Sequence, residues 1–373
     1  MKKKYITFSL VTLVLLVALI TSFNYFKTTN AYIDDSVNNQ TKITKGISMN
    51  LEQTAGAGDY KTVTRSSWPT EGYKFNAELS RCENGSTLSW DDTKKAVIVS
   101  GNLSDKCYVY FDIYQPTLAE YIKSQYTGTQ GDNGIYYHNS TLANGAGDNS
   151  YRYAGASDSV NNYICLGSDA ATCPDANLFR IIGVFGNQTK VIRAKSVGDK
   201  QWHTSQVNTW SSSSLNTYLN GEYLTSLGTL ADKIATTTCK VGGGSWANIG
   251  TSVPKTAYQY EVGSNASSTT NDAKIGLMYV SDYGFAADQS GWTTKLSSYS
   301  SNTSKNWLYL GSDEWTISRY SGTTFSAFFV DSTGNVSSDS VTLSCAVRPS
   351  FSLLSSITYV SGSGSMSDPV RVN

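Results

Sequence analysis

Six cysteines constrain this chain more than any other feature, because each disulfide would join two separated points of the backbone. They stand at Cys82, Cys107, Cys165, Cys173, Cys239 and Cys345. Two pairs bracket segments whose ends can meet: ENGSTLSWDDTKKAVIVSGNLSDK, which has strand–turn–strand character, and the short loop LGSDAAT. We therefore predict the disulfides Cys82–Cys107 and Cys165–Cys173, which leaves Cys239 to pair with Cys345. Each bridge would stabilise the fold by roughly 2–4 kcal/mol.

Metal binding and thiol catalysis are the competing roles for these cysteines. Zinc sites usually combine closely spaced cysteines with further cysteines or histidines, whereas this sequence has no C-x₂₋₄-C spacing and only two histidines, His138 and His203. A nucleophilic thiolate also needs a nearby base. The glycine-rich stretches GDNG and NGAG lack the ligand order of an EF-hand loop. We therefore predict no metal site, no cofactor and no catalytic residue, and we do not expect an enzyme.

The N-terminus has the form of an export segment. Three lysines precede an uncharged, largely apolar stretch over residues 5–26, which is long enough to cross a bilayer as a helix of about 20 residues. Residues 1–31 are either a signal peptide cut after Ala31 or a membrane anchor that keeps its lysines inside. Both alternatives place the rest of the chain outside the cell, secreted or attached to its surface, where disulfides persist.

Composition and charge narrow the partners. The formal net charge is 0, and removal of residues 1–31 would leave 25 basic and 29 acidic residues. A nucleic-acid surface needs a basic field, so we expect no nucleic-acid partner. Only 16% of the residues are charged, against about 25% in typical globular chains. Ser, Thr, Asn, Gly and Tyr make up the difference, which favours strands joined by polar loops.

Turn signals divide the chain into segments. Residues 32–50 lack apolar periodicity and read as a stalk, and residues 51–114 alternate β-branched and aromatic runs with turns, which is typical of a small β module. Residues 115–126 read as a linking helix, with Pro116 at its start. Residues 127–373 form the expected second domain, so the predicted class is α+β.

Within the second domain the clearest signal is the hairpin NLFRIIGVFGNQTKVIRA, which is expected to turn at Gly186–Asn187. Two helices are predicted over SSSSLNTYLNGEYL and LGTLADKIATTT from their apolar periodicity. IGLMYVSDYGFA reads as a buried strand that runs into a turn. The segments WTISRYSG, SAFFVDSTGNVSS and LSCAVRPSFSL are expected to be three antiparallel strands.

One group of residues is the tentative ligand surface. It comprises Trp307, Asp313, Glu314, Trp315 and Arg348. Acids flanked by aromatic rings suit contact with a sugar, and a pair of carboxylates is also what a glycosidase uses. The competing interpretation is a turn with aromatic rings packed beneath it. For Arg348 the alternatives are an ion pair or carbonyl anchor near the end of its strand and a ligand contact.

The segments quoted above, with AVRPSFSL and YVSGSGSMSDPVRVN, resemble those of uncharacterised bacterial cell-surface proteins with a C-terminal C-type-lectin-like domain. The block with CENG and CYVYF is similar to the small disulfide-stapled β module in front of it. The resemblance implies two helices around antiparallel hairpins, with long loops that carry the binding surface. The calcium-binding motifs of sugar-binding lectins and the paired cysteines of formylglycine-generating relatives are both missing here.

These observations lead to three functional hypotheses. The first is an exported cell-surface binding or adhesion protein whose unknown ligand is a glycan or a protein, with a membrane contact through residues 5–26 if that segment stays uncleaved. The second is a structural subunit of the cell envelope or of an appendage. The third is a surface hydrolase that uses Asp313 or Glu314.

Overall fold

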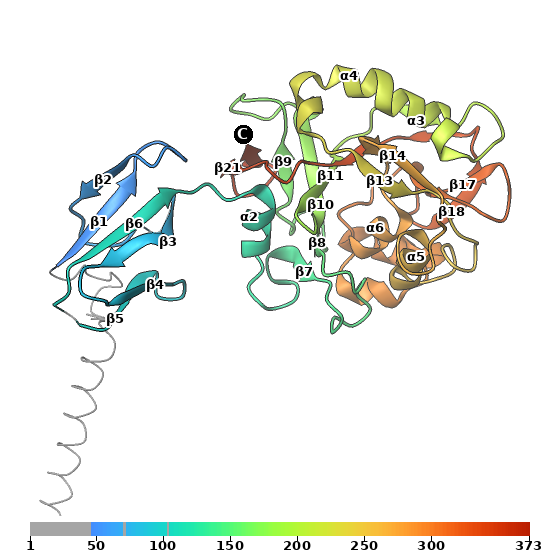
Figure 1. Ribbon diagram of the computed structural model, residues 1–373. Helices are drawn as coiled ribbons and strands as arrows, with labels where there is room; N and C mark the ends of the chain where they lie inside the picture. Colours follow the sequence, from blue (N-terminus) through green and yellow to red (C-terminus); the bar gives the residue numbers. More distant parts are fainter. Residues whose placement is uncertain (1–45, 70–71, 103) are drawn as a thin grey trace, which may run out of the picture. The chain divides into compact units, whose positions relative to one another are not determined.

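The computed structural model describes residues 46–69, 72–102 and 104–373. It divides into two compact units, Met1–Gln115 and Pro116–Asn373 (Figure 1). The predicted export segment, residues 1–31, lies outside the described residues. Among the residues that are described, no helix combines the length and the apolar character needed to cross a membrane.

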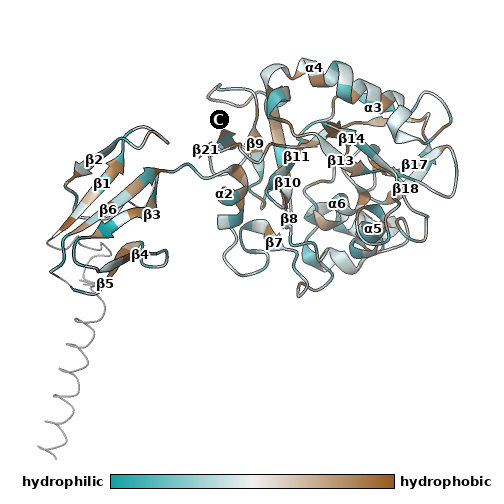
Figure 2. Ribbon diagram, in the orientation of Figure 1, coloured by the Kyte–Doolittle hydropathy of each residue, from teal (hydrophilic) through white to brown (hydrophobic). Residues whose placement is uncertain are grey.

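Within its described residues, the first unit is built from strands. Its four-stranded sheet has the order β2-β1-β6-β3, and a separate hairpin pairs β4 with β5. The strands are β1 (Ile47–Glu52), β2 (Tyr60–Val63), β3 (Tyr73–Cys82), β4 (Thr87–Asp91), β5 (Ala96–Ser100) and β6 (Cys107–Ile113). Apolar and polar residues alternate along β1 and β6 (Figure 2), so one sheet face supplies Met49, Leu51, Val109 and Phe111 to a small core.

Two details of the first unit bear on the sequence predictions. Cys82 and Cys107 face each other across β3 and β6 and form a disulfide, as predicted. The boundary between stalk and module at residue 50 was wrong, because β1 begins at Ile47 and pairs in parallel with β6. Sequence periodicity could not show this pairing, since it depends on a strand at the other end of the module.

The second unit contains a nine-stranded sheet and a five-stranded sheet. In the nine-stranded sheet, the order β15-β20-β11-β10-β9-β22-β21 is extended by β8 beside β10 and by β7 beside β8. Its strands are β7 (Ile135–Tyr137), β8 (Tyr151–Tyr153), β9 (Tyr163–Cys165), β10 (Leu178–Phe185), β11 (Gln188–Arg193), β15 (Ile275–Gly276), β20 (Ser350–Ser352), β21 (Tyr359–Ser361) and β22 (Val370–Val372).

The centre of this sheet is the predicted hairpin. Phe185 pairs with Gln188 across the two-residue turn, and Gly186 has the positive φ of 64° that such turns require. The hairpin also needs glycine at position 183, because a Cβ built there would lie 2.3 Å from the carbonyl oxygen of Tyr151 in the neighbouring strand β8. The hairpin is therefore set by turn chemistry at one end and by close backbone approach in its middle.

The five-stranded sheet has the order β12-β19-β16-β17-β18, and a two-stranded ribbon pairs β13 with β14. These strands are β12 (Asp199–Gln201), β13 (Thr237–Lys240), β14 (Thr270–Ala273), β16 (Glu314–Arg319), β17 (Ser326–Val330), β18 (Val336–Ser340) and β19 (Ser344–Ala346). The prediction that LSCAVRPSFSL is a third antiparallel strand beside the other two was wrong. Within this run, β19 pairs in parallel with β16, and β20 belongs to the nine-stranded sheet. Pro349 lies between β19 and β20, where its missing N–H interrupts a ladder.

Helical segments are more numerous than the three predicted, which are the linking helix and the two in the second domain. The α-helices are α2 (Leu118–Ser124), α3 (Ser214–Tyr218), α4 (Leu224–Ser226), α5 (Pro254–Glu261) and α6 (Val280–Phe285), and a π-helical turn, η4 (Leu219–Tyr223), joins α3 to α4. The 3₁₀ segments are η1 (Asp132–Gly134), η2 (Asp175–Asn177), η3 (Trp210–Ser212), η5 (Gly228–Lys233), η6 (Gln289–Thr293) and η7 (Leu296–Lys305).

Two helix predictions and one strand prediction change in detail. The predicted linking helix is α2, which has a Thr117–Glu120 capping box and buries Leu118 and Ile122 in the core of the second unit, so it is part of that unit. The second predicted helix is only the 3₁₀ segment η5. The run expected to be a long buried strand has two strand residues and then becomes α6, which Asp282 caps by accepting a hydrogen bond from the backbone N–H of Tyr279.

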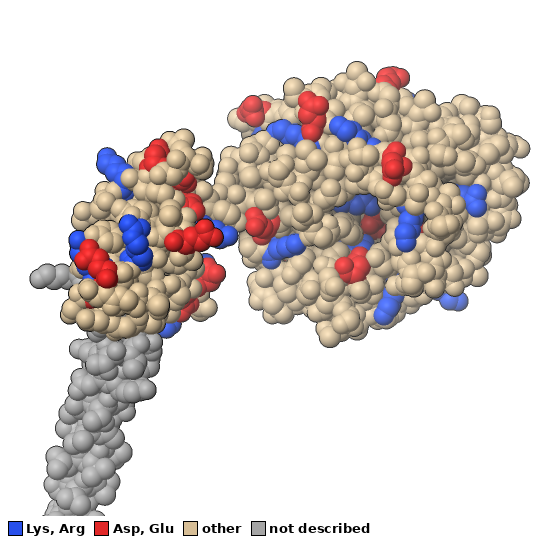
Figure 3. Space-filling view, in the orientation of Figure 1, with Lys and Arg blue, Asp and Glu red and all other residues tan. Residues whose placement is uncertain are grey.

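Aromatic side chains fill the core of the second unit. Trp202, Trp210, Trp292 and Trp315 are among the largest side chains that are fully buried. Charged side chains are widely spaced over the face of this unit seen in Figure 3, in keeping with the low charged fraction of the sequence. The fold class is therefore a mixed one in which strands outnumber helices.

Candidate functional site

The structure buries most of the tentative ligand surface. Trp307, Glu314, Trp315 and Arg348 are exposed by 2%, 1%, 0% and 3%, and only Asp313 is half-buried. The prediction that these residues form a surface was therefore wrong. All of Glu314–Ser318 in β16 is buried, so both faces of this strand are covered.

Arg348 and Glu314 form a buried ion pair. The Arg348 Nε lies 2.7 Å from Glu314 Oε1, and its Nη2 donates to Glu314 Oε2 at 2.8 Å and to the carbonyl oxygen of Leu308 at 2.5 Å. Burial raises the pKa of the Glu314 carboxyl, and Arg348 opposes that shift. Arg348 therefore has the ion-pair and carbonyl-anchor role, and this pair ties β16 to the segment between β19 and β20.

The other predicted site residues have structural roles as well. The Trp307 indole donates to the carbonyl oxygen of Tyr153 at 2.8 Å, and the Trp315 indole donates to that of Lys200 at 3.0 Å. Asp313 accepts a hydrogen bond from the backbone N–H of Ser332 at 2.7 Å. These contacts agree with the competing interpretation of the sequence, in which a turn lies above packed aromatic rings.

The predicted Cys239–Cys345 disulfide is absent. Both cysteines are free thiols, and they belong to different sheets, since Cys239 lies in β13 and Cys345 in β19. Burial raises the pKa of the Cys345 thiol to about 12. The two cysteines were paired only by elimination. This prediction failed because the ribbon β13–β14 and the five-stranded sheet are two separate sheets.

A second buried polar cluster joins β8, β11 and α6. The Arg152 guanidinium, which is 2% exposed, lies 2.7 Å from Asp148 Oδ2 and 3.5 Å from Asp282 Oδ1, and Lys190 Nζ lies 2.5 Å from Asp282 Oδ2. Burial opposes ionisation of Asp148, but Arg152 and the hydrogen bonds from Ser150 together outweigh it and lower the pKa of that carboxyl to about 2. Opposite charges alternate through the cluster, so it stabilises the packing of α6 on the sheet.

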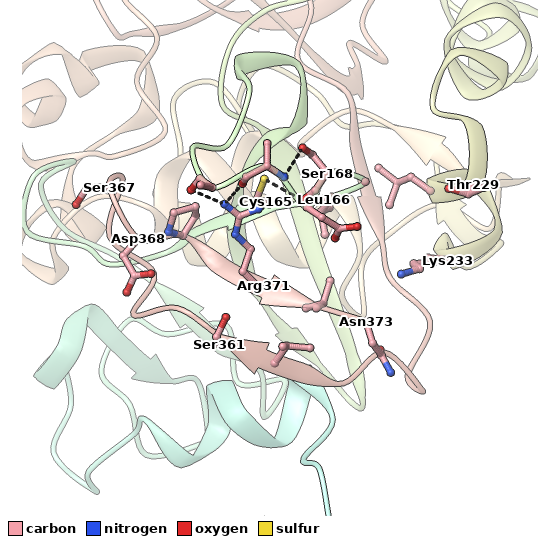
Figure 4. Close-up of a pocket in the computed structure, with 18 residues that line it drawn as sticks. Cys165, Leu166, Ser168, Thr229, Lys233, Ser361, Ser367, Asp368, Arg371 and Asn373 are labelled. Atoms are coloured by element: carbon pink, nitrogen blue, oxygen red, sulfur yellow. Dashed lines mark hydrogen bonds between the residues drawn. The ribbon is translucent and has the colours of Figure 1, made fainter.

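A pocket of about 650 Å³ opens beside the predicted loop disulfide (Figure 4). Cys165 at the end of β9 bonds to Cys173, which closes the loop between them. Three segments that lie far apart in the sequence line the pocket: the stapled loop, the segment η5 and the C-terminal hairpin β21–β22. The lining residues are 165–171, 229–230, 233, 360–361, 367–369 and 371–373. We call this site the disulfide-loop pocket.

Arg371 holds the stapled loop in place. Its Nη1 donates to the carbonyl oxygen of Ser168 at 2.9 Å, and its Nη2 donates to those of Ala170 and Ala171 at 2.8 and 3.2 Å. In Figure 4 the Arg371 side chain runs from β22 toward this loop, with Lys233 and Thr229 on another side of the pocket. The disulfide and Arg371 therefore tie this loop to β9 and β22.

The lining offers hydrogen bonds and charges of both signs. Asp169, Lys233 and Asp368 stand among hydroxyl groups such as that of Ser361 and aliphatic side chains such as that of Val360. None of the lining residues is a histidine, and Cys165 is held in a disulfide. Across the described part of the chain, no three His, Cys, Asp or Glu side chains are grouped to hold a metal ion. The chemistry that this pocket supports directly is ligand binding.

Sequence reasoning missed this pocket because its walls come from separate segments. SGSGS at residues 361–365 contributes to one rim, although it reads as a plain turn. The only local signal was the short cysteine-bracketed loop, which marks a fixed, exposed segment.

Comparison with known proteins gives one match. Residues 186–355 match the model of a family described as a domain of unknown function (DUF6273). Among curated proteins no significant match is found, and none is found among solved structures. The match spans η5 but neither the stapled loop nor β21–β22, so two of the three walls of the disulfide-loop pocket lie outside the matched region.

Proposed function

We propose that this protein is an exported cell-surface binding or adhesion protein whose second unit, a C-type-lectin-like head, takes its ligand in the disulfide-loop pocket. The observation that carries the proposal is a pocket with polar and aliphatic walls, formed by a loop that a disulfide and Arg371 hold in one conformation. A preformed site loses less conformational entropy when a ligand binds than a mobile loop would. The export segment and the two disulfides support an oxidising location.

The proposed fold likeness has its own support. The unit has antiparallel hairpins flanked by helices, and its first and last segments meet, since the Leu118 N–H donates to the carbonyl oxygen of Ile357 at 2.7 Å. Some connecting segments, such as that between β7 and β8, carry little regular structure. These features agree with the architecture that the sequence resemblance implies.

A binding assay with the full chain tests this function. The labelled protein would be applied to arrays of glycans and of peptides, together with Ser361→Trp, which fills the pocket from β21. The control is Ser321→Trp, an exposed serine outside the pocket. We expect a ligand that the wild type and the control bind and that Ser361→Trp does not. Absence of any array ligand, or equal binding by both variants, would contradict the proposal.

The alternative of an envelope or appendage subunit makes a different prediction. A chain that assembles with its own copies would sediment as a multimer at micromolar concentration. It would do so equally with Ser361→Trp if the pocket has no part in assembly. Surface labelling of intact cells, followed by N-terminal sequencing of the labelled protein, tests the location and the fate of residues 1–31.

A further inference from the structure

The rim of the disulfide-loop pocket is unusually apolar for this protein. Among the described residues, seven large hydrophobic side chains are exposed, and three of them come from the short stretch 354–366. Leu354, Val360 and Met366 are exposed by 39%, 51% and 62%. Val360 lines the pocket, Met366 precedes the lining residue Ser367, and the Leu354 N–H donates to the carbonyl oxygen of the lining residue Lys233.

Exposed aliphatic side chains that gather on one part of a surface are a feature of sites that bind other proteins. Val360 also belongs to β21, which is the edge strand of the nine-stranded sheet. The chain itself occupies both ends of this edge, because the Tyr359 N–H donates to the carbonyl oxygen of Pro116 and the Tyr121 hydroxyl donates to that of Gly362. The contact that β21 offers a ligand is therefore the exposed Val360 side chain in the pocket wall.

The charges around the pocket favour one kind of peptide. The acidic side chains Asp169 and Asp368 are exposed, whereas Lys233 and Arg371 are half-buried. The Arg371 guanidinium is moreover directed at the carbonyl oxygens of the stapled loop. The charge that an arriving ligand meets first is therefore negative, which favours a basic partner. No aromatic ring lines the pocket, so a sugar would find no flat ring to stack on.

We infer that the ligand of the disulfide-loop pocket is an extended segment of a partner protein that carries aliphatic and basic side chains. The segment lies across the mouth of the pocket, with an aliphatic side chain against Val360 and a basic side chain toward Asp169 and Asp368. This inference rests on the proposed function, because it names the ligand class for the same pocket. It selects protein over glycan as the surface partner.

A synthetic library of short peptides tests it with the full chain. In each peptide, positions that carry Val, Leu or Ser alternate with positions that carry Lys, Glu or Ser. Binding is measured by fluorescence anisotropy. We expect selection of aliphatic-plus-Lys peptides. Val360→Asp should weaken their binding by at least about tenfold, and Val207→Asp, at a valine that is 46% exposed outside the pocket, should leave it unchanged.

Charge reversal provides an independent readout. Asp169→Lys should weaken the binding of Lys peptides by about tenfold and strengthen the binding of Glu peptides. Asp158→Lys, at an exposed acid outside the pocket, should change neither. Unchanged unfolding midpoints would show that the variants are folded. Peptide binding that Val360→Asp leaves intact overturns the inference. Glycan binding that Ser361→Trp removes, without any peptide binding, overturns it while the proposed function stands, and absence of every ligand refutes both.

Discussion

Substitution of Glu314 by Gln should destabilise the second unit strongly. Glu314 and Arg348 are nearly inaccessible to water and share two hydrogen bonds. The variant would leave the Arg348 charge buried with a carbonyl oxygen and an amide as partners. Removal of one member of a buried ion pair typically costs about 3–5 kcal/mol, and we expect a loss of that size. Urea unfolding followed by tryptophan fluorescence measures it, since six of the eight tryptophans lie in this unit.

The reverse substitution, Arg348→Met, should depend on pH in the opposite sense to Glu314→Gln. Burial already raises the pKa of Glu314, and Arg348 is what holds it down, so the pKa rises further in the variant. A carboxyl whose folded-state pKa lies above its unfolded value loses stability as the pH rises between those two values. The cost of Arg348→Met should therefore be smaller at pH 5 than at pH 8. Glu314→Gln removes the titrating carboxyl, whose raised pKa makes the wild type lose stability as the pH rises, so the cost of Glu314→Gln should change in the opposite sense and be larger at pH 5 than at pH 8.

Two results would refute this reasoning. One is a cost below about 1 kcal/mol for Glu314→Gln, which is the range of an exposed pair. The other is an equal pH dependence for the two variants. As a control, the double variant Glu314→Leu/Arg348→Met should recover much of the lost stability, because apolar replacement of a buried pair is often nearly neutral.

Three further predictions follow from single contacts. Thiol titration of the denatured, unreduced chain should find two thiols, Cys239 and Cys345, and Cys345 should resist alkylation before denaturation. Detection of no thiol would show that these two cysteines form a disulfide after all. Gly183→Ala should lower the free energy of unfolding by about 1–3 kcal/mol, because its Cβ would meet backbone that cannot easily move, and an unchanged urea midpoint would contradict it. Burial raises the pKa of Glu261 to about 7, so between pH 4.5 and 7 this carboxyl should make the wild-type unfolding free energy fall as the pH rises. Glu261→Gln should remove that contribution, and an equal slope in both proteins would show that the carboxyl ionises normally.

Local features of the fold were predictable where the chemistry is local. The hairpin around Gly186, the short helix after Pro116 and the two short-range disulfides depend on residues close together in the sequence. The predictions that failed depend on long-range contacts. The run from Cys345 past Pro349 divides between two sheets, and no periodicity in that run reveals the strands it joins.

The candidate site shows the same limit. Arg348 was recognised as unusual in an apolar strand, but only the tertiary structure brings Glu314 to it from β16. The pocket residues were not recognised at all, because Lys233, Asp169 and Asp368 are ordinary surface residues when each is read in its own segment.

The sequence by itself determined the stapled loops and the division into a β module and a larger mixed domain. It also predicted the export segment. These follow from composition, from turn residues and from the short separation of paired cysteines. Only the tertiary structure decided which acids and arginines are buried together, which cysteines stay free and where a pocket forms. The physical reason is that burial and pairing depend on the sum of contacts from distant segments, while propensity and turn chemistry act within a few residues.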